Sequence, residues 1–418
     1  MVFLFIIQPI QIRANEKKDE KILTIEYVME EGQKHSHEVL YYTHRWLMLH
    51  YQKEDTKDTL NNIKEPRLPS LELLPVTREE LLAAYPHYDQ LTDEEKQEID
   101  RIIDIQIQIN QSLNMILLAN HQNTSSQLKE LEKEIAEKKR ELQQIIKEID
   151  IEQGITKINE QEIKEFIQYY LAKRYIDILL YDEQITFLEK GIQFLKDDVK
   201  RVELSLSIGY ASKEELKKVK QQLSSKEREL LNLKKSRQLL EKQLMIDLNI
   251  SLTQKVMFQP VNISVMRKIE HPKNMDNIIE NSFVYQKNKK NLEIAIYKKE
   301  QASGNNEKQQ MEQNVKMVEA QLNTTKQKLK KLLLERYNYF ELLYEKCEGL
   351  NNDYEQALLD KEHYEKQLQI GLISKHEYNS LIMKLDEIIK NYRLAKLEYY
   401  LAGIEEKQIH RGYIPTDN

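Results

Sequence analysis

Four histidines close together near the N-terminal end are the first residues whose type and spacing could do chemistry. They are His35, His37, His44 and His50. His37 and His44 are seven residues apart, which places them two turns from each other on one face of a helix. A metal site would also need a cysteine or a well-spaced carboxylate, and this segment supplies neither. We therefore predict that no metal is bound here.

Enzyme motifs provide no other candidate. The sequence contains no GxGxxG loop, no P-loop, no nucleophile elbow and no HExxH zinc motif. Acidic pairs such as Asp197-Asp198 stand in a highly charged stretch, which is typical of a solvated helix face rather than of paired catalytic carboxylates. We expect a protein that is not an enzyme, with no catalytic residues and no cofactor.

Basic and aromatic residues gather in segments that each have two interpretations. The segment KNKKNLEIAIYKK, residues 287–299, could contact anionic lipid, but a solvated helix face is favoured. Aromatic residues recur in two corresponding stretches, where packing in a core or between protomers is favoured over stacking on a ligand. These residues are Tyr169, Tyr170, Tyr175, Tyr181, Tyr337, Tyr339, Phe340 and Tyr344.

The composition indicates long helices. Of the 418 residues, 32% are charged and only nine are Gly and eight are Pro, which is typical of an all-α, coiled-coil protein with little or no β structure. The net charge of −6 provides no overall basic field, so we expect no nucleic acid partner. The single cysteine, Cys347, excludes an internal disulfide.

The first residues are similar to the end of a secretory signal. Residues 2–7 are apolar, and Ala14 could precede a cleavage point, although a basic leading region is missing. The alternative is a buried strand or helix end. We favour a signal-like segment over 1–16 and therefore export. No other run approaches the roughly 20 apolar residues of a membrane-spanning helix.

Prolines divide the rest of the chain. None occurs between Pro86 and Pro260 or between Pro272 and Pro415, and apolar residues there follow the 3,4 spacing of coiled coils. The connector at 251–272 contains an apolar alternation over 261–265, which would allow a short strand there. The segment 102–116 also alternates, but its apolar residues form a helical stripe as well, so we predict a helix.

One motif occurs twice, 162 residues apart. Ile-Gly-x-x-Ser-Lys-x-Glu spans 208–215 and again 370–377, and the same offset aligns Arg174-Tyr175 with Arg336-Tyr337. Periodic leucines alone would not produce these matches, so we infer an internal duplication. Each half then consists of a lead helix, a linker, a long helix, the glycine motif and a return helix.

The glycine motif predicts a tight turn between two long antiparallel helices. Glycine supplies the left-handed conformation that ends a helix. The serine three residues later, followed by glutamate three residues on, forms a capping box that starts the next helix. Tyr210 and Ala211, like Leu372 and Ile373, would then lie at an exposed tip. They could form a contact surface, or they could only stabilise the turn.

These residues resemble a known family. SLSIGYASKEELKKVKQQL and LQIGLISKHEYNSLIMKL resemble the tip turns of TolC-type efflux proteins, the outer membrane factors, and the lead segments from Leu23 and Met275 resemble the family's opening helices. The resemblance implies a homotrimer whose tips engage a membrane-fusion adaptor and, through it, an inner-membrane transporter. The tip contacts that it implies are Ile208, Gly209, Tyr210, Ala211, Ser212, Ile370, Gly371, Leu372, Ile373 and Ser374.

The sequence departs from this family in one respect. The family inserts two membrane strands between lead helix and long helix in each half. Only ASGNNE stands at that place in the second half, whereas a membrane strand needs roughly 9–11 residues. The longer linker of the first half is charged, is broken by prolines and lacks the required alternation. We therefore expect the helical part of the fold without the membrane strands.

The predicted organisation follows from these observations. It comprises a signal-like segment at 1–16, a first repeat at 22–250 with a linker at 53–98 and a tip at 208–212, a connector at 251–272, a second repeat at 273–405 with a tip at 370–374, and a tail at 406–418.

We expect a passive export component of the cell envelope, outside the cytoplasmic membrane, with an outer-membrane or periplasmic location only if the source has an outer membrane. The alternatives are a non-transporting extracytoplasmic coiled-coil protein and an unrelated cytoplasmic coiled-coil scaffold.

Overall fold

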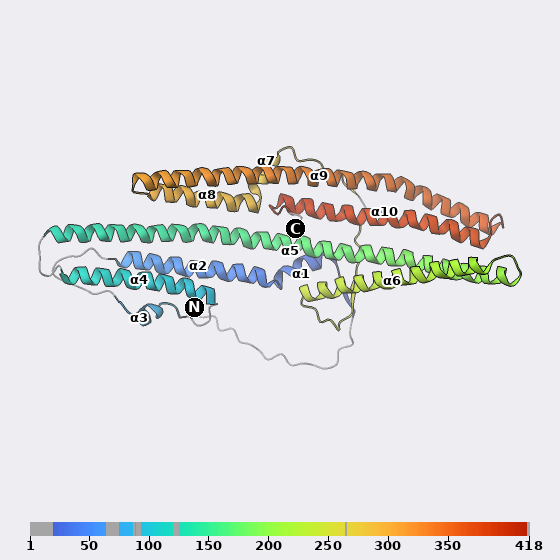
Figure 1. The fold of residues 1–418 in the computed structure, drawn as a ribbon, viewed down its shortest axis with the longest axis horizontal. Helices are drawn as coiled ribbons and strands as arrows, with labels where there is room; N and C mark the ends of the chain where they lie inside the picture. The colour runs from blue at the N-terminus through green and yellow to red at the C-terminus, as the bar shows by residue number, and fades with distance from the viewer. Residues whose placement is uncertain are drawn as a thin grey trace. The chain divides into compact units, whose positions relative to one another are not determined.

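The chain is almost entirely helical. The computed structural model describes residues 20–63, 75–86, 88, 93–119, 125–263 and 266–415, which contain ten helices and two three-residue strands (Figure 1). The prediction of an all-α fold with little β structure is confirmed. The signal-like segment predicted at 1–16 lies outside the described residues.

Two compact units make up the chain, and each takes residues from both predicted repeats. Unit 1 comprises Met1–Ser36, Glu165–Lys273 and Leu332–Asn418, and unit 2 comprises His37–Lys164 and Asn274–Lys331. Two helices contribute to both units: α5 (Ser125–Ser207) and α9 (Asn305–Gln369).

Unit 1 contains the two predicted hairpins. The C-terminal part of α5 pairs with α6 (Lys213–Asp247), and that of α9 pairs with α10 (Lys375–His410). Apolar residues at 3,4 spacing face each other along these helices, and one such cluster holds Val199, Val202 and Val219. Figure 1 shows both turns at the same end of this unit.

Ion pairs define the order of the helices in unit 1. Lys234 of α6 lies 2.6 Å from Glu189 of α5, Lys190 of α5 lies 2.9 Å from Asp386 of α10, and Lys346 of α9 lies 2.7 Å from Glu398 of α10. The order is therefore α6, α5, α10, α9. Exposed pairs of this kind stabilise by less than about 1 kcal/mol each, so they select register rather than supply the stability, which comes from the buried apolar seams.

The two strands lie at the opposite end of unit 1 from the turns. β1 (Lys21–Leu23) pairs in parallel with β2 (Val256–Phe258). The sequence allowed a short strand over 261–265; its described residues, 261–263, are not in a strand, and residues 264–265 lie outside the described residues. Pro260 restricts the backbone and cannot donate a hydrogen bond, so the pairing segment ends before it, and Val256 and Phe258 provide the inward-facing alternation instead.

Tyr175 joins this small sheet to the helices. Its hydroxyl lies 2.8 Å from the carbonyl oxygen of Leu23 and 2.6 Å from that of Gln259, and the side chain is fully buried. Burial raises its pKa well above the usual range of a tyrosine. Helix α1 (Ile25–Lys34) packs closely against α5 in this region. A Cβ placed on Gly32 of α1 would lie 2.0 Å from the Leu171 side chain of α5.

Unit 2 is a bundle of shorter helices and the first parts of α5 and α9. Its own helices are α2 (His37–Asn62), α3 (Arg78–Leu82), α4 (Asp93–Ala119), α7 (Met275–Asn281) and α8 (Phe283–Gln301). The helical interpretation of 102–116 is confirmed by α4. The linker expected at 53–98 is shorter than predicted, since α2 continues to Asn62 and α4 begins at Asp93.

The basic segment 287–299 forms ion pairs on α8 with the first part of α5. Lys287 lies 2.5 Å from Glu162, Lys298 lies 3.5 Å from Glu148, and Glu293 lies 3.5 Å from Lys147 of α5. These contacts support the interpretation as a helix face, since two of the segment's five lysines pair with carboxylates of α5. Among the described helices, none has both the length and the apolar composition of a membrane span.

Candidate functional site

The first turn of unit 1 is closed by a glycine in the left-handed conformation. Gly209 has φ of 83°, and its N–H donates to the carbonyl of Leu206 at 3.1 Å. The N–H of Tyr210 donates to the carbonyl of Ser205 at 2.8 Å. This pair of bonds is the Schellman motif, which satisfies the last carbonyls of α5 and reverses the chain.

The second turn has the same backbone arrangement. Gly371 has φ of 75°, its N–H donates to Leu368 at 3.1 Å, and the N–H of Leu372 donates to Gln367 at 2.9 Å. No described atom lies within 4 Å of a Cβ built at either glycine. The requirement for glycine is therefore conformational rather than steric, because a side chain would have room but not an unstrained backbone.

A serine begins the return helix after each turn. The hydroxyl of Ser212 accepts from the N–H of Glu215 at 3.0 Å, and that of Ser374 accepts from the N–H of Glu377 at 3.1 Å. These are the N-cap bonds predicted from the spacing. Each turn is thus fixed on both sides, by a glycine that ends one helix and a serine that starts the next.

The turns expose apolar side chains to solvent. Tyr210 is 86% exposed and Ile208 is 61% exposed at the first turn, while Ile370 is 72% and Leu372 is 70% exposed at the second. Ala211 and Ile373 are half-buried, and Ala211 packs against the valine cluster of α5 and α6. Each predicted tip therefore separates into residues that stabilise the turn and residues that face solvent.

The second turn lies against the first hairpin. His376 follows Ser374 and stacks on Phe194 of α5 with ring centroids 5.5 Å apart, and its Nδ1 lies 3.7 Å from a carboxylate oxygen of Asp198. Nearby, burial raises the pKa of Tyr378, and the carboxylate of Glu365 raises it further. These contacts place the first turn of α10 beside residues 194–198 of α5.

Sequence reasoning missed one exposed residue at the first turn. Leu204 lies one helical turn before Ile208 on α5 and is 66% exposed. The heptad pattern suggests that leucines in this stretch are buried, so only the position of the neighbouring helices reveals it.

The histidine segment has structural contacts in this protein. His50 stacks on Trp46 with centroids 5.6 Å apart, and Nε2 of His35 lies 3.4 Å from a carboxylate oxygen of Glu31. In the part of the chain that the structure describes, no group of three or more His, Cys, Asp or Glu could hold a metal ion.

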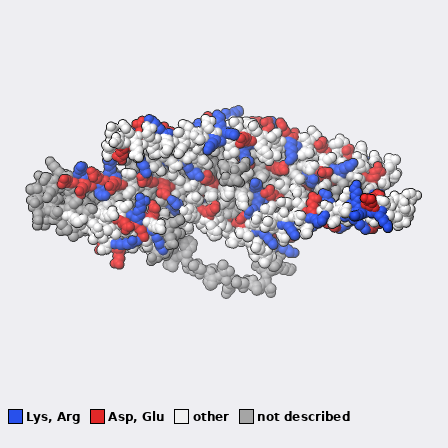
Figure 2. Space-filling model, viewed as in Figure 1, with Lys and Arg blue, Asp and Glu red and all other residues white. Residues whose placement is uncertain are grey.

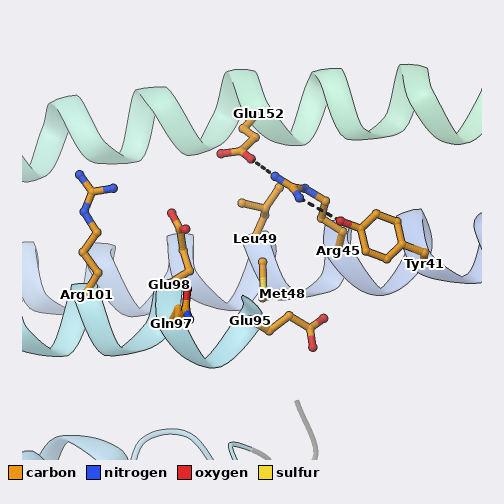
Figure 3. Close-up of a pocket in the computed structure, with 9 residues that line it drawn as sticks. All are labelled: Tyr41, Arg45, Met48, Leu49, Glu95, Gln97, Glu98, Arg101 and Glu152. Carbon is orange, nitrogen blue, oxygen red and sulfur yellow. Dashed lines mark hydrogen bonds and ion pairs between the residues drawn. The ribbon is translucent and has the colours of Figure 1, made fainter. Parts of the chain in front are cut away.

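A cleft of about 400 Å³ in unit 2 is formed by α2, α4 and α5 (Figure 3). Arg45 bridges its upper side, 2.5 Å from Glu152 and 3.1 Å from the hydroxyl of Tyr41. Figure 3 shows Glu98 and Arg101 extending from α4 toward α5. Charges of both signs line the cleft, so its lining does not define a ligand class. None of the predicted tip residues belongs to it.

Comparison with solved structures finds outer membrane channels. The outer membrane protein VceC of Vibrio cholerae is 13% identical and covers 66% of this chain and 76% of its own, with a TM-score of 0.48. CusC, whose structures concern folding and transmembrane channel formation, is 11% identical over 65% and 72%, with a TM-score of 0.49. The CmeC outer membrane channel of Campylobacter jejuni is 10% identical over 66% and 69%, also with a TM-score of 0.49.

Likeness at these identities and TM-scores does not decide what this chain does. No family model matches the sequence, and no curated protein matches it either.

Proposed function

We propose that this chain is a TolC-like export component of the cell envelope. It forms a passive helical conduit or docking element, and it engages a membrane-fusion adaptor through its two hairpin tips. The residues proposed to contact the adaptor are those of the two tips, 208–212 and 370–374. Energy for transport would come from an inner-membrane transporter bound through the adaptor.

The pair of equivalent turns is the observation that carries this proposal. Both use the same glycine and serine geometry, both belong to unit 1, and both present apolar side chains that the fold leaves exposed. An exposed apolar side chain at the end of a long helical hairpin adds little to stability, because it buries little area. A partner that covers such residues would account for their presence at both tips.

The edges of unit 1 support self-association. In the order α6, α5, α10, α9, the outer helices are α6 and α9, and both carry exposed leucines or isoleucines away from their hairpin seams. These are Leu231, Leu239 and Ile246 on α6, and Leu334, Leu342 and Leu359 on α9. The two edges are different surfaces, so copies would join head to tail, and such contacts form a ring where the rotation between copies closes. We propose a homotrimer.

A mass measurement tests this function. The purified full chain is measured alone and with a membrane-fusion adaptor encoded in the same genome. We expect trimers alone and a larger complex with the adaptor. Replacing both turn glycines, Gly209→Val and Gly371→Val, should weaken adaptor binding at least tenfold, because a β-branched residue at positive φ distorts the turn.

Helix content measured by circular dichroism should stay nearly unchanged in this variant, since only the turns are altered. Gly349→Ala is the matched control, because Gly349 lies inside α9 and no described atom is within 4 Å of a Cβ there. Unaltered adaptor binding by the valine variant would contradict docking through the tips. A strict monomer at high concentration would contradict a closed conduit.

A further inference from the structure

The two turns share a backbone but differ in charge. Residues 200–220 around the first turn contain six Lys and Arg against three Asp and Glu, whereas the equivalent residues 362–382 around the second contain two against three. The first turn is therefore basic, and the second is close to neutral. Figure 2 shows basic side chains gathered just behind the first turn, whose own end is uncharged.

Part of the basic charge at the first turn is already paired. Arg201 lies 2.7 Å from Asp198, and Lys220 lies 2.7 Å from Glu203. In contrast, none of the ion pairs of the described residues includes Lys213, Lys217 or Lys218. All three are exposed on the first turns of α6. They form an unpaired basic group next to the tip.

Apolar side chains stand beside these lysines. Leu204 lies in the last turn of α5, Ile208 follows directly after its end, and Tyr210 at the apex is the most exposed of the three. A convex apex of this kind cannot enclose a small ligand, but it can enter the headgroup region of a bilayer. Tyrosine is favoured at that depth, and lysines around it extend toward anionic headgroups.

We propose that the first turn binds the surface of an anionic phospholipid membrane. In this arrangement Tyr210, Ile208 and Leu204 enter the headgroup region, and Lys213, Lys217 and Lys218 contact the lipid phosphates. Peripheral binding generally needs two signals, an apolar insertion and a basic patch, and the first turn carries both. The second turn carries the apolar signal, but its two lysines are outnumbered by three acidic residues.

This inference depends on the hairpin geometry but not on adaptor binding. Ile208 and Tyr210 cannot contact lipid and an adaptor at the same time, so membrane binding describes the first turn when no adaptor covers it. An acidic protein surface could satisfy the same lysines, but the combination of a convex apolar apex with a basic rim favours a lipid surface. The acidic residues next to these lysines in the sequence are Glu214 and Glu215, which lie in the first turn of α6, where the helix dipole favours negative charge. The region remains positive when they are counted.

The test is co-sedimentation of the purified full chain with vesicles of phosphatidylcholine alone, and with vesicles of equal parts phosphatidylcholine and phosphatidylglycerol. We expect binding only to the anionic vesicles, and weaker binding as salt is raised. Lys217→Asn together with Lys218→Ser installs the residues of the second turn and should weaken binding roughly tenfold or more. The matched control is Lys366→Asn with Lys375→Asn at the second turn, which should bind like the parent chain.

A fluorescence measurement separates insertion from charge attraction. Tyr210→Trp should show a blue-shifted emission with anionic vesicles, and Leu372→Trp should not. Absence of vesicle binding would overturn the proposal, as would equal binding by the two lysine variants. If Lys217→Asn with Lys218→Ser weakens binding of an adaptor but not of vesicles, the basic group is a protein-docking surface and the lipid proposal is wrong. Vesicle binding without adaptor binding would instead contradict only the proposed function.

Discussion

The two turns have nearly the same backbone and different surroundings. Gly209 and Gly371 differ by only a few degrees in φ and make the same pair of backbone bonds. Yet the first turn ends in an exposed tyrosine beside unpaired lysines, whereas the second is held against α5 through His376. Glycine and serine therefore determine the reversal of the chain, and the neighbouring residues determine what each turn can bind.

The other ends of the two hairpins show a similar contrast. Tyr175 and Tyr337 occupy positions 162 apart, and both are fully buried. The hydroxyl of Tyr175 meets two backbone carbonyls of the sheet region, whereas that of Tyr337 lies 3.4 Å from Nε2 of His410. Burial raises the pKa of Tyr337 to about 12. Equivalent positions are thus alike in burial and different in polar contacts, which supports a duplication followed by divergence.

The largest expected effect is the removal of either buried ring. Tyr175→Ala and Tyr337→Ala should each lower the free energy of unfolding by about 3–5 kcal/mol, because each leaves a cavity in a packed interior. Denaturant titration followed by circular dichroism measures this. A small effect at one position and a large effect at the other would break the equivalence of the two hairpins.

Removing only the hydroxyls should separate the two positions. Tyr175→Phe should cost about 1–2 kcal/mol, because a buried carbonyl loses its donor, whereas Tyr337→Phe should cost less than about 0.5 kcal/mol. The same denaturant titration measures both costs, and the loss of unfolding free energy in the corresponding Ala variant is the upper limit for each. Equal costs would show that the sheet contact of Tyr175 does not distinguish the hairpins.

The turns themselves should respond alike. Gly209→Ala and Gly371→Ala should each cost about 1 kcal/mol of unfolding free energy, because alanine is strained at positive φ. Gly349→Ala in the helix interior should instead stabilise by up to about 1 kcal/mol. A thermal melt of the three variants is sufficient. Stabilisation at either turn would contradict the left-handed geometry.

The smallest expected effect concerns an acid that only the first hairpin carries. Burial raises the pKa of Asp177, and the equivalent position in the second hairpin is Tyr339. The pKa of the Asp177 carboxyl is higher in the folded state than in the unfolded state. At a pH above the unfolded-state pKa, ionising this buried carboxyl therefore costs free energy and destabilises the folded protein. Asp177→Asn should therefore raise the unfolding midpoint at pH 7 and leave it unchanged at pH 3. A shift of the same size at both pH values would exclude ionisation as the cause.

Local signals made the turns predictable from the sequence. A glycine, a serine at the right distance and a glutamate after it determine a helix end and a helix start, and these depend only on nearby residues. The helix at 102–116 was predictable for the same reason, since its apolar stripe has a helical period and α4 confirms it. Contact of the tips with a partner stays a prediction.

Long-range contacts explain what could not be predicted. β1 and β2 have three residues each and are separated by most of the first repeat, so neither has a local pattern strong enough to identify it. The pairing of Lys287 with Glu162 depends on which helices are neighbours, and so does the exposure of Leu204. A single sequence contains the charges and apolar residues but not their partners.

The central claim is that the chain reverses at Gly209 and at Gly371, and a distance between spin labels tests it most directly. Cys347 is buried, and burial raises the pKa of its thiol to about 11, so a Cys347→Ser background keeps the labels specific. Labels are placed by Glu189→Cys with Lys234→Cys across the first turn, and by Lys346→Cys with Glu398→Cys across the second. Both parent pairs lie in contact, at 2.6 Å and 2.7 Å. We predict short label distances for both, whereas roughly 70 Å or more, the length of an uninterrupted helix at 1.5 Å per residue, would contradict the reversal.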